Sequence, residues 1–269
     1  MSQTTTAEPT HSDDRTPYRV RHDTKRRRLV VKDIRKLTPH MTRVTLGGDE
    51  LAGFVSLGFD DHVKLFFPDA VSTERDVNGE PKPVSRDYTP RRYDAAANTL
   101  EIEFALHKAG PATQWAEQAK PGDILNIGGP RGSLVIPTGF DWHLLIGDDT
   151  ALPAIGRRLA ELPRNARAVV LAEVDSAADE IAFEHATDAS ITWVHRNGAE
   201  AGSPQPLAEA LRKLTLPDGD FYAWVACESL TAKALRAQLV ADKGANPKWL
   251  RAAGYWRRGA AAVHDTYND

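Results

Sequence analysis

The hydrophobic pattern of the chain changes near residue 139, and this change constrains the fold more than any other feature. Between residues 29 and 137, six short stretches of strand character are separated by glycine, proline, asparagine and aspartate. They are LVVKDI, TRVTLGG, DHVKLFFP, RDYTPRRY, TLEIEFALH and DILNIGG. Many short strands at this spacing are typical of an antiparallel barrel. From residue 139 on, apolar runs alternate with helical patterns, which is the order of a parallel sheet covered by crossover helices.

The pattern therefore predicts two domains of different fold class. We expect an antiparallel six-stranded β-barrel over residues 28–138 and a Rossmann-like parallel sheet with flanking helices over residues 139–244. The remaining segments lie outside both patterns. Residues 1–27 are polar and run into Lys25-Arg26-Arg27-Arg28, so we predict a flexible, solvated arm. Residues 245–269 show no further strand pattern, and we expect a helical extension rich in basic and aromatic residues.

Composition excludes several classes of protein. A net charge of -3 argues against bulk affinity for nucleic acid. The sequence has no apolar run near the ~18 residues that a membrane span requires, and its N-terminus lacks the apolar core of a secretory signal. The single Cys227 can build neither a disulfide framework nor a cysteine-ligated iron-sulfur cluster. We therefore predict a cytoplasmic, monomeric protein without stable membrane insertion and without a metal site.

The most informative short string is Arg86-Asp87-Tyr88-Thr89-Pro90-Arg91. A flavin dinucleotide needs a cation for its pyrophosphate, a flat side chain near its ring system, and hydrogen bonds to the polar edge of the ring. Arg86, Tyr88 and Thr89 supply these three groups, and on a strand the first two project to one side. The alternative is an edge strand with a surface arginine and a packed tyrosine.

A second string places a Gly-Pro turn directly before a predicted helix. It runs from His107 through Gly110 and Pro111 to Ala112 and Thr113. The free backbone N–H groups and the positive end of the helix dipole there make a cradle for phosphate. An ordinary helix start has the same appearance, but one ligand of the right length could use both strings.

The two strings and three later ones establish a resemblance. RDYTPRRYD, HKAGPATQWA, GGPRGS, GDDTALPAIGRRL and GYWRRG follow one another in this chain. In this order and over residues 29–259 the sequence closely resembles the siderophore-interacting protein family of flavin-dependent ferric-siderophore reductases, which have a fold like that of ferredoxin reductase. The resemblance implies FAD on the barrel, held by Arg86, Tyr88, Thr89, His107, Gly110, Pro111, Ala112 and Thr113.

The resemblance also implies that the turn from Asp148 through Asp149 and Thr150 to Ala151 faces NADH or NADPH, with Glu228 as a further contact. The turn lies at the carboxyl end of the first predicted parallel strand, where ligands of open sheets bind. A purely structural helix cap is the alternative. The choice of dinucleotide stays open. Acidic residues at the end of the second strand, Glu173 and Asp175, disfavour the extra phosphate of NADPH, whereas Arg196 after the third strand favours it.

The implied activity is the reduction of siderophore-bound Fe(III) by NAD(P)H through FAD, with release of Fe(II) for iron assimilation. Nicotinamide delivers two electrons together and Fe(III) accepts one, so a flavin is the physical adaptor and no catalytic side chain is required. An acidic protein that binds an anionic ferric siderophore needs a local basic patch. The candidates are Lys64, Arg131, Lys248, Arg251, Arg257 and Arg258. The alternatives are a general NAD(P)H-dependent flavin reductase and a siderophore-binding module without redox function.

Overall fold

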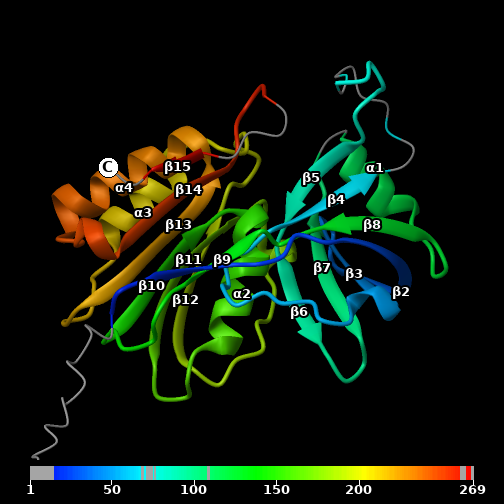
Figure 1. The fold of residues 1–269 in the computed structure, drawn as a ribbon. Coiled ribbons are helices and arrows are strands. Elements are labelled where there is room, and N and C mark those ends of the chain that lie inside the picture. The colour runs from blue at the N-terminus through cyan, green and yellow to red at the C-terminus, as the bar shows by residue number, and fades with distance from the viewer. Residues whose placement is uncertain are drawn as a thin grey trace, which may run out of the picture.

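The computed structural model contains two large β-sheets that lie side by side, and a separate pair of short strands (Figure 1). It describes residues 15–67, 70, 75, 77–107, 110–260 and 265–267. The first sheet is antiparallel, and its strand order is β5-β4-β8-β2-β3-β7-β6. Its strands are β2 (Arg26–Thr38), β3 (Met41–Gly47), β4 (Val63–Phe67), β5 (Val84–Tyr88), β6 (Pro90–Asp94), β7 (Thr99–Ala105) and β8 (Ile124–Gly128). Two short helices accompany it, η1 (Asp49–Leu51) and α1 (Pro111–Gln118).

This sheet has seven strands where the sequence predicts six, because the predicted strand RDYTPRRY divides at Thr89. Tyr88 in β5 pairs with Val63 on one edge of the sheet, and Pro90 in β6 pairs with Ile102 on the other edge. Thr89 is thus the single residue between β5 at one edge of the sheet and β6 at the other. The Tyr88 ring packs on Phe104 of β7 at a centroid distance of 4.6 Å, so the sheet curls until its edges meet. The predicted barrel character is confirmed, and the strand count is corrected.

The second sheet has the order β12-β11-β10-β13-β14-β15. Its strands are β10 (Trp142–Gly147), β11 (Arg167–Val174), β12 (Asp188–His195), β13 (Phe221–Glu228), β14 (Leu250–Trp256) and β15 (Asp265–Tyr267). All neighbouring pairs are parallel except β14 with β15. Three α-helices accompany this sheet, α2 (Leu152–Glu161), α3 (Gln205–Lys213) and α4 (Ser229–Lys243). Single helical turns also occur at η2 (Asp149–Ala151), η3 (Ala177–Asp179) and η4 (Pro247–Trp249). This is the predicted Rossmann-like arrangement.

The helices cover the two faces of this sheet. In Figure 1, α3 and α4 lie on one face, while α2 lies between the two sheets. Leu211 of α3 and Leu235 of α4 are buried in one apolar cluster, and Ile155 and Leu159 of α2 are buried in another. None of the helices within the described residues is long and apolar enough to span a membrane.

The prediction for the C-terminal segment is wrong for most of its described residues. Residues 250–256 form β14 beside β13, and residues 265–267 form β15. Only a single turn, η4 (Pro247–Trp249), is helical before them. The strand is favoured because Ala252 and Ala253 are fully buried and Gly254 lies against Ser229 of α4, so small side chains let the helix approach the sheet closely.

The prediction of a flexible N-terminal arm is also corrected where the structure describes it. Residues 1–14 lie outside the described residues. Residues 18–21 form β1 (Tyr18–Arg21), which pairs antiparallel with β9 (Gly132–Val135). Farther along, Arg27 is 5% exposed and donates to the Gly129 carbonyl at 3.2 Å. Backbone pairing with a segment more than a hundred residues away holds this stretch, which a local sequence pattern cannot indicate.

Candidate functional site

A cleft of about 430 Å³ opens between the two sheets. From the barrel side it is lined by all eight residues that the sequence predicts for FAD, namely Arg86, Tyr88, Thr89, His107, Gly110, Pro111, Ala112 and Thr113. From the other sheet it is lined by Thr150 and Trp256, among others. The cleft therefore brings together segments from β5, the end of β7, the start of α1, the turn after β10 and the end of β14.

The β5 side of the cleft carries a cation, an aromatic ring and a buried hydroxyl. Arg86 is half-buried, and its Nη1 atom donates to the Ser85 carbonyl at 2.8 Å. Burial raises the pKa of Tyr88 above its ordinary value, and the charge of Arg86 opposes this rise. Tyr88 is thus a neutral phenol at physiological pH. Thr89, at the point where the chain crosses between the edges of the sheet, is 7% exposed.

The first turn of α1 presents backbone N–H groups to the cleft. Gly110 is the residue before the helix, has an extended backbone (φ -152°), and no side chain caps the helix. The first turn contains no acidic residue. The side-chain oxygen of Thr113 accepts a hydrogen bond from the backbone N–H of His107 at 3.3 Å. Because the first N–H groups of a helix have no partner within it, Ala112 and Thr113 can bind ligand oxygens.

The turn after β10 is built around a buried carboxylate. Asp148 is 2% exposed and accepts hydrogen bonds from the N–H of Thr150 at 3.0 Å and from the indole Nε1 of Trp256 at 2.8 Å. Burial and the neighbouring charge of Asp149 raise the pKa of Asp148 to about 6, although its hydrogen bonds oppose the rise. The alternative that the sequence left open, a structural helix cap, is present, since Asp148 caps η2 (Asp149–Ala151). Of the four residues of this turn, only Thr150 lines the cleft.

Carboxylates surround Arg196 at the same edge of the sheet. Its guanidinium lies 3.0 Å from Asp149, 3.5 Å from Glu173 and 3.8 Å from Asp175. Burial raises the pKa of Glu173 to about 7, with a further contribution from Asp148 and an opposing one from Arg196. The three residues that give contradictory signals about dinucleotide preference in the sequence therefore form one group, in which Arg196 pairs with both Glu173 and Asp175.

Glu228 caps α4. Its Oε2 atom accepts from the N–H groups of Leu230 at 2.7 Å and Thr231 at 3.1 Å, and its Oε1 atom accepts from the N–H of Arg258 at 3.3 Å. It does not line the cleft. The carboxylate satisfies backbone donors at a helix start and ties the end of β14 to it. Its contact with a dinucleotide stays a prediction.

The predicted substrate cations have different surroundings. Lys64 lines the cleft and lies 2.9 Å from Asp87, whereas Arg131 and Lys248 are exposed outside the cleft lining. The other three form ion pairs: Arg251 with Asp60 at 2.6 Å, Arg257 with Asp265 at 2.9 Å and Arg258 with Glu200 at 3.1 Å. Because Asp60 has a side chain only 5% exposed, Arg251 is a structural partner of a buried carboxylate.

Several residues that line the cleft are absent from the set of sites predicted from the sequence, among them Asp60, Tyr255 and Trp256. The Tyr255 hydroxyl donates to Asp60, which joins the end of β14 to the loop before β4. The Trp256 ring stacks on His107 at a centroid distance of 6.3 Å. Both aromatic residues belong to the GYWRRG string, so the signal was present, but their sheet position depends on β14, which the sequence pattern did not reveal.

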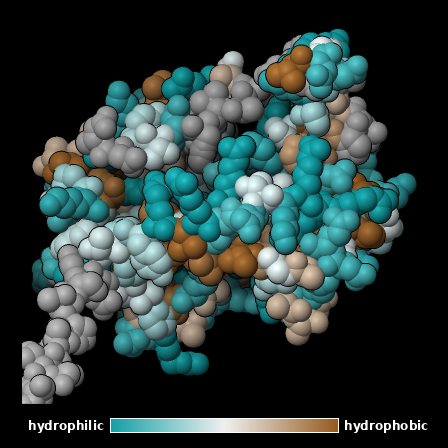
Figure 2. Space-filling model, viewed as in Figure 1, coloured by the Kyte–Doolittle hydropathy of each residue, from teal (hydrophilic) through white to brown (hydrophobic). Residues whose placement is uncertain are grey.

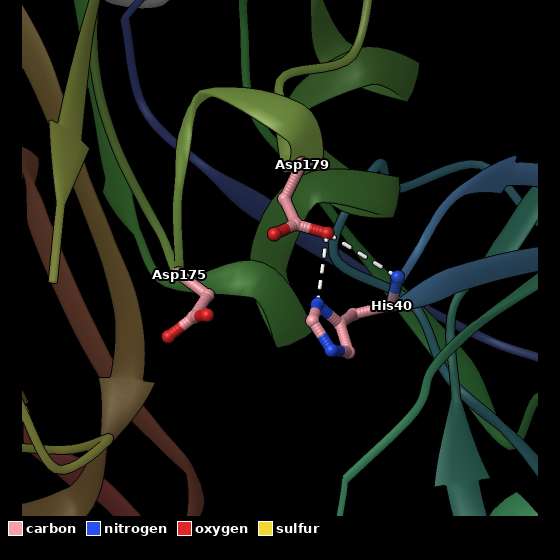
Figure 3. Close-up of side chains that lie close together, drawn as sticks. All are labelled: His40, Asp175 and Asp179. Atoms are coloured by element: carbon pink, nitrogen blue, oxygen red, sulfur yellow. Dashed lines mark hydrogen bonds and ion pairs between the residues drawn. The ribbon is translucent and has the colours of Figure 1, made fainter. Parts of the chain in front are cut away.

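One group of potential metal ligands occurs within the described residues, away from the cleft. Atoms of His40, Asp175 and Asp179 lie within 4.8 Å of one another. Figure 3 shows that Asp179 is engaged by His40, whose backbone N–H and Nδ1 lie 3.2 Å and 3.0 Å from the same carboxylate oxygen, while no interaction joins Asp175 to either. The Asp179 side chain thus links η3 to the turn between β2 and β3.

Comparison with known protein families divides the chain in the same way. The family model for the siderophore-interacting FAD-binding domain matches residues 30–134, and the family model for the siderophore-interacting protein matches residues 140–259. The chain is 37% identical to an NADPH-dependent ferric-chelate reductase of Escherichia coli K12, over 90% of this chain and 97% of the relative. It is 34% identical to a ferric vibriobactin reductase of Vibrio cholerae, over 83% and 86% of the two chains.

Solved structures of related proteins have the same fold. The crystal structure of a siderophore utilization protein from T. fusca has a TM-score of 0.84 and 39% identity, and the match covers 92% of this chain and 98% of that one. A siderophore-interacting protein from Aeromonas hydrophila has a TM-score of 0.72 and 28% identity, with 92% and 94% of the chains covered. The chain belongs to the siderophore-interacting protein family.

Proposed function

We propose that this protein is an FAD-dependent ferric-siderophore reductase that takes electrons from NAD(P)H and passes them singly to Fe(III). One observation carries the proposal. Eight residues predicted for FAD come from three separate segments of the barrel and line one cleft, and Thr150 and Trp256 of the dinucleotide-type sheet line the same cleft. The relatives named as ferric-chelate and ferric vibriobactin reductases support the choice of acceptor.

The residues on the barrel side fit an FAD molecule. Arg86 and the free N–H groups of Ala112 and Thr113 provide positive charge and donors for a pyrophosphate. Tyr88 provides a neutral ring, and Thr89 a hydroxyl close to it. When bound, FAD accepts an electron pair and releases electrons singly, which is the chemistry that joins a hydride donor to a one-electron acceptor.

The dinucleotide would bind at the carboxyl edge of the second sheet, which is where open parallel sheets hold ligands. Thr150 lies in the cleft, so this edge adjoins the flavin side. Asp148, Asp149, Ala151 and Glu228 act mainly by fixing the turn and the helix starts around it. We assign residues 28–138 to flavin binding and residues 139–244 to dinucleotide binding.

The acceptor would approach the cleft from the side of Lys64 and Arg131, with Arg257 and Arg258 as further cations near the end of β14. Reduction to Fe(II) weakens binding by hard oxygen ligands, and this weakening releases the iron. We further propose that the protein acts in the cytoplasm, as a monomer and without nucleic acid.

The test is an anaerobic titration of the purified protein. Its visible spectrum is recorded, NADH or NADPH is added, and a ferric siderophore then follows together with an Fe(II) chelator. We expect a flavin spectrum that bleaches with the dinucleotide, and then recovers as the coloured Fe(II) chelate forms with two equivalents of iron per flavin, since a hydride carries two electrons.

The alternatives give different results. A general flavin reductase bleaches with the dinucleotide, reduces free flavin, and returns electrons to the ferric siderophore only through that free flavin. A binding module without redox function is colourless and takes up no flavin. Either result would overturn the proposal.

A further inference from the structure

The carboxyl edge of the second sheet holds one arginine among several carboxylates. Each guanidinium nitrogen of Arg196 faces a carboxylate oxygen: Nη2 lies 3.0 Å from Asp149, Nη1 lies 3.5 Å from Glu173, and Nε lies 3.8 Å from Asp175. We call these four residues the acidic edge. The Arg196 side chain is 8% exposed, whereas the Asp175 side chain is 45% exposed. The arginine is thus occupied within the protein, and the most exposed group of the acidic edge is a carboxylate.

Backbone hydrogen bonds between the ends of β11 and β12 support this arrangement. The N–H of Arg196 donates to the Val174 carbonyl at 2.9 Å, and the N–H of Asn197 donates to the Asp175 carbonyl at 3.1 Å. The two loops that follow these strands therefore start side by side. In Figure 3 the Asp175 carboxylate forms no interaction with the other two side chains drawn. Asp175 thus presents oxygens that a ligand hydroxyl can reach.

The two loops that leave the acidic edge add negative charge. Residues 175–187 follow β11 and residues 196–204 follow β12, and Arg196 is the only lysine or arginine in either range. The acidic residues of these ranges are Asp175, Asp179, Glu180, Glu184 and Glu200. A cation from the segment after β14, Arg258, approaches the second loop and pairs with Glu200 at 3.1 Å. The face of the molecule shown in Figure 2 is largely hydrophilic, so the sign of the charge, and not polarity, distinguishes this edge.

The acidic edge continues from the cleft along the sheet. Thr150 lines the cleft, and the residue before it, Asp149, pairs with Arg196. In the strand order β10-β11-β12, Asp149 follows β10, Asp175 follows β11 and Arg196 follows β12. Open parallel sheets hold extended ligands across the carboxyl ends of their strands. We therefore expect a dinucleotide with its nicotinamide in the cleft to reach the end of β11 with its adenosine.

NADH and NADPH differ at one position of the adenosine ribose. NADH has a 2′-hydroxyl, which can donate a hydrogen bond to a carboxylate. NADPH has a phosphate monoester there, which carries nearly two negative charges at neutral pH and would meet like charge beside Asp175. Arg196 could pair with this phosphate only by leaving Asp149 and Glu173, and a buried carboxylate without its cation is unfavourable.

We propose that the acidic edge makes this protein selective for NADH over NADPH, with Asp175 as the specificity-determining residue that accepts a hydrogen bond from the 2′-hydroxyl of the adenosine ribose. Arg196 is a positioning residue that holds the carboxylates together. The inference rests on the proposed function and deepens it, since it names the electron donor. The Escherichia coli relative is named as NADPH-dependent, so this edge is where we expect the two proteins to differ.

The test measures binding without electron transfer. Calorimetric titration of the FAD-loaded protein gives the Kd for ADP-ribose and for 2′-phospho-ADP-ribose, which differ only in the phosphate. We expect the wild type to bind ADP-ribose at least about tenfold more tightly, and we expect Asp175→Asn to lower this ratio about tenfold. The wild-type ratio should shrink as salt is added, since the charge of a half-exposed carboxylate is screened.

Two further variants separate the role of Asp175 from general charge and from Arg196. Asp188→Asn removes an exposed carboxylate at the opposite, amino end of β12 and should leave the ratio of the two Kd values unchanged. Arg196→Gln should change both Kd values by a similar factor, because a positioning residue does not contact the phosphate. A selective loss of 2′-phospho-ADP-ribose in this variant would instead identify Arg196 as the phosphate ligand and overturn the proposal.

Three other outcomes decide the inference. A wild type that binds 2′-phospho-ADP-ribose as tightly as ADP-ribose would overturn it, and so would equal effects of Asp175→Asn and Asp188→Asn. If neither ligand binds, both the inference and the dinucleotide site are wrong. If ADP-ribose binds as expected but NADH does not bleach the flavin, the proposed function is wrong, because the binding measurement needs no electron transfer.

Discussion

The indole N–H of Trp256 donates a hydrogen bond of 2.8 Å to Oδ2 of Asp148, and the two residues are separated by 108 positions in the chain. The bond joins the end of β14 to the turn after β10, and it places Trp256 at the cleft, where the ring stacks on His107 of the barrel side. A buried acceptor thus determines where an aromatic side chain of the second sheet lies in the cleft.

The first prediction concerns the raised pKa of Asp148, which is about 6 in the folded protein. The folded state holds the proton more tightly than the unfolded state, whose pKa is near 3.9. The contribution of Asp148 to the free energy of unfolding should therefore fall as pH rises from about 4 to about 6, and stay constant above that.

Urea unfolding between pH 4 and pH 8 checks this prediction. The difference between wild type and Asp148→Asn should change across that window, whereas the difference between wild type and Asp188→Asn, an exposed carboxylate on β12, should be flat. A parallel course of all three curves would contradict it.

The second prediction concerns FAD retention. Arg86→Ala removes the cation on the β5 side of the cleft, so the flavin should dissociate during purification and its Kd should rise at least tenfold, since charge-assisted bonds to phosphate are strong. The ratio of flavin to protein absorbance measures the loss. Arg92→Ala on β6, an exposed arginine outside the cleft lining, is the matched control. Full flavin content in the Arg86 variant would remove Arg86 from the flavin site.

The third prediction compares Arg251 with Arg257, which the sequence analysis lists together as candidates for substrate binding. Arg251→Ala leaves Asp60 buried without its cation and should lower the free energy of unfolding by about 3 kcal/mol. Arg257→Ala breaks an exposed ion pair with Asp265 and should cost less than about 1 kcal/mol. Chemical denaturation of the two variants gives the comparison. Similar losses of unfolding free energy in the two variants would show that the burial of Asp60 does not determine how much its ion pair stabilises the protein.

The fourth prediction concerns Arg157, a residue of α2 that is 6% exposed. It donates to the Ser56 hydroxyl at 2.8 Å and to the carbonyls of Ser56 and Pro90 at 2.9 Å and 3.0 Å. Arg157→Met leaves the buried Pro90 carbonyl and the half-buried Ser56 acceptors without this donor and should lower the free energy of unfolding by about 2 kcal/mol. Arg164→Met, an exposed arginine beyond the end of α2, should change the stability by less than about 0.5 kcal/mol. A small loss for both would exclude Arg157 as a link between the sheets.

Local patterns were sufficient for the elements whose stability depends on nearby residues. The start of α1 follows from a Gly-Pro turn, and the strand around Arg86 follows from alternating residues between breakers. The division of that strand at Thr89 was missed, because it depends on which edge of the sheet each half joins. The strand β14 was missed for a similar reason. Its cations and aromatic residues resemble a surface helix, and only pairing with β13 and the close approach of α4 to Gly254 favour an extended chain of small residues.

The sequence by itself determined the two-domain order, the flavin-type strings and the absence of a cysteine framework, since these depend on residue identity and short spacing. Only the tertiary structure decided which cations are available. Arg251 is bound to Asp60 across 191 residues, and Arg196 is bound to Asp149 across 47 residues. The physical reason is that the effect of a charge depends on the groups within a few ångströms of it, and strand pairing between distant segments determines which groups those are.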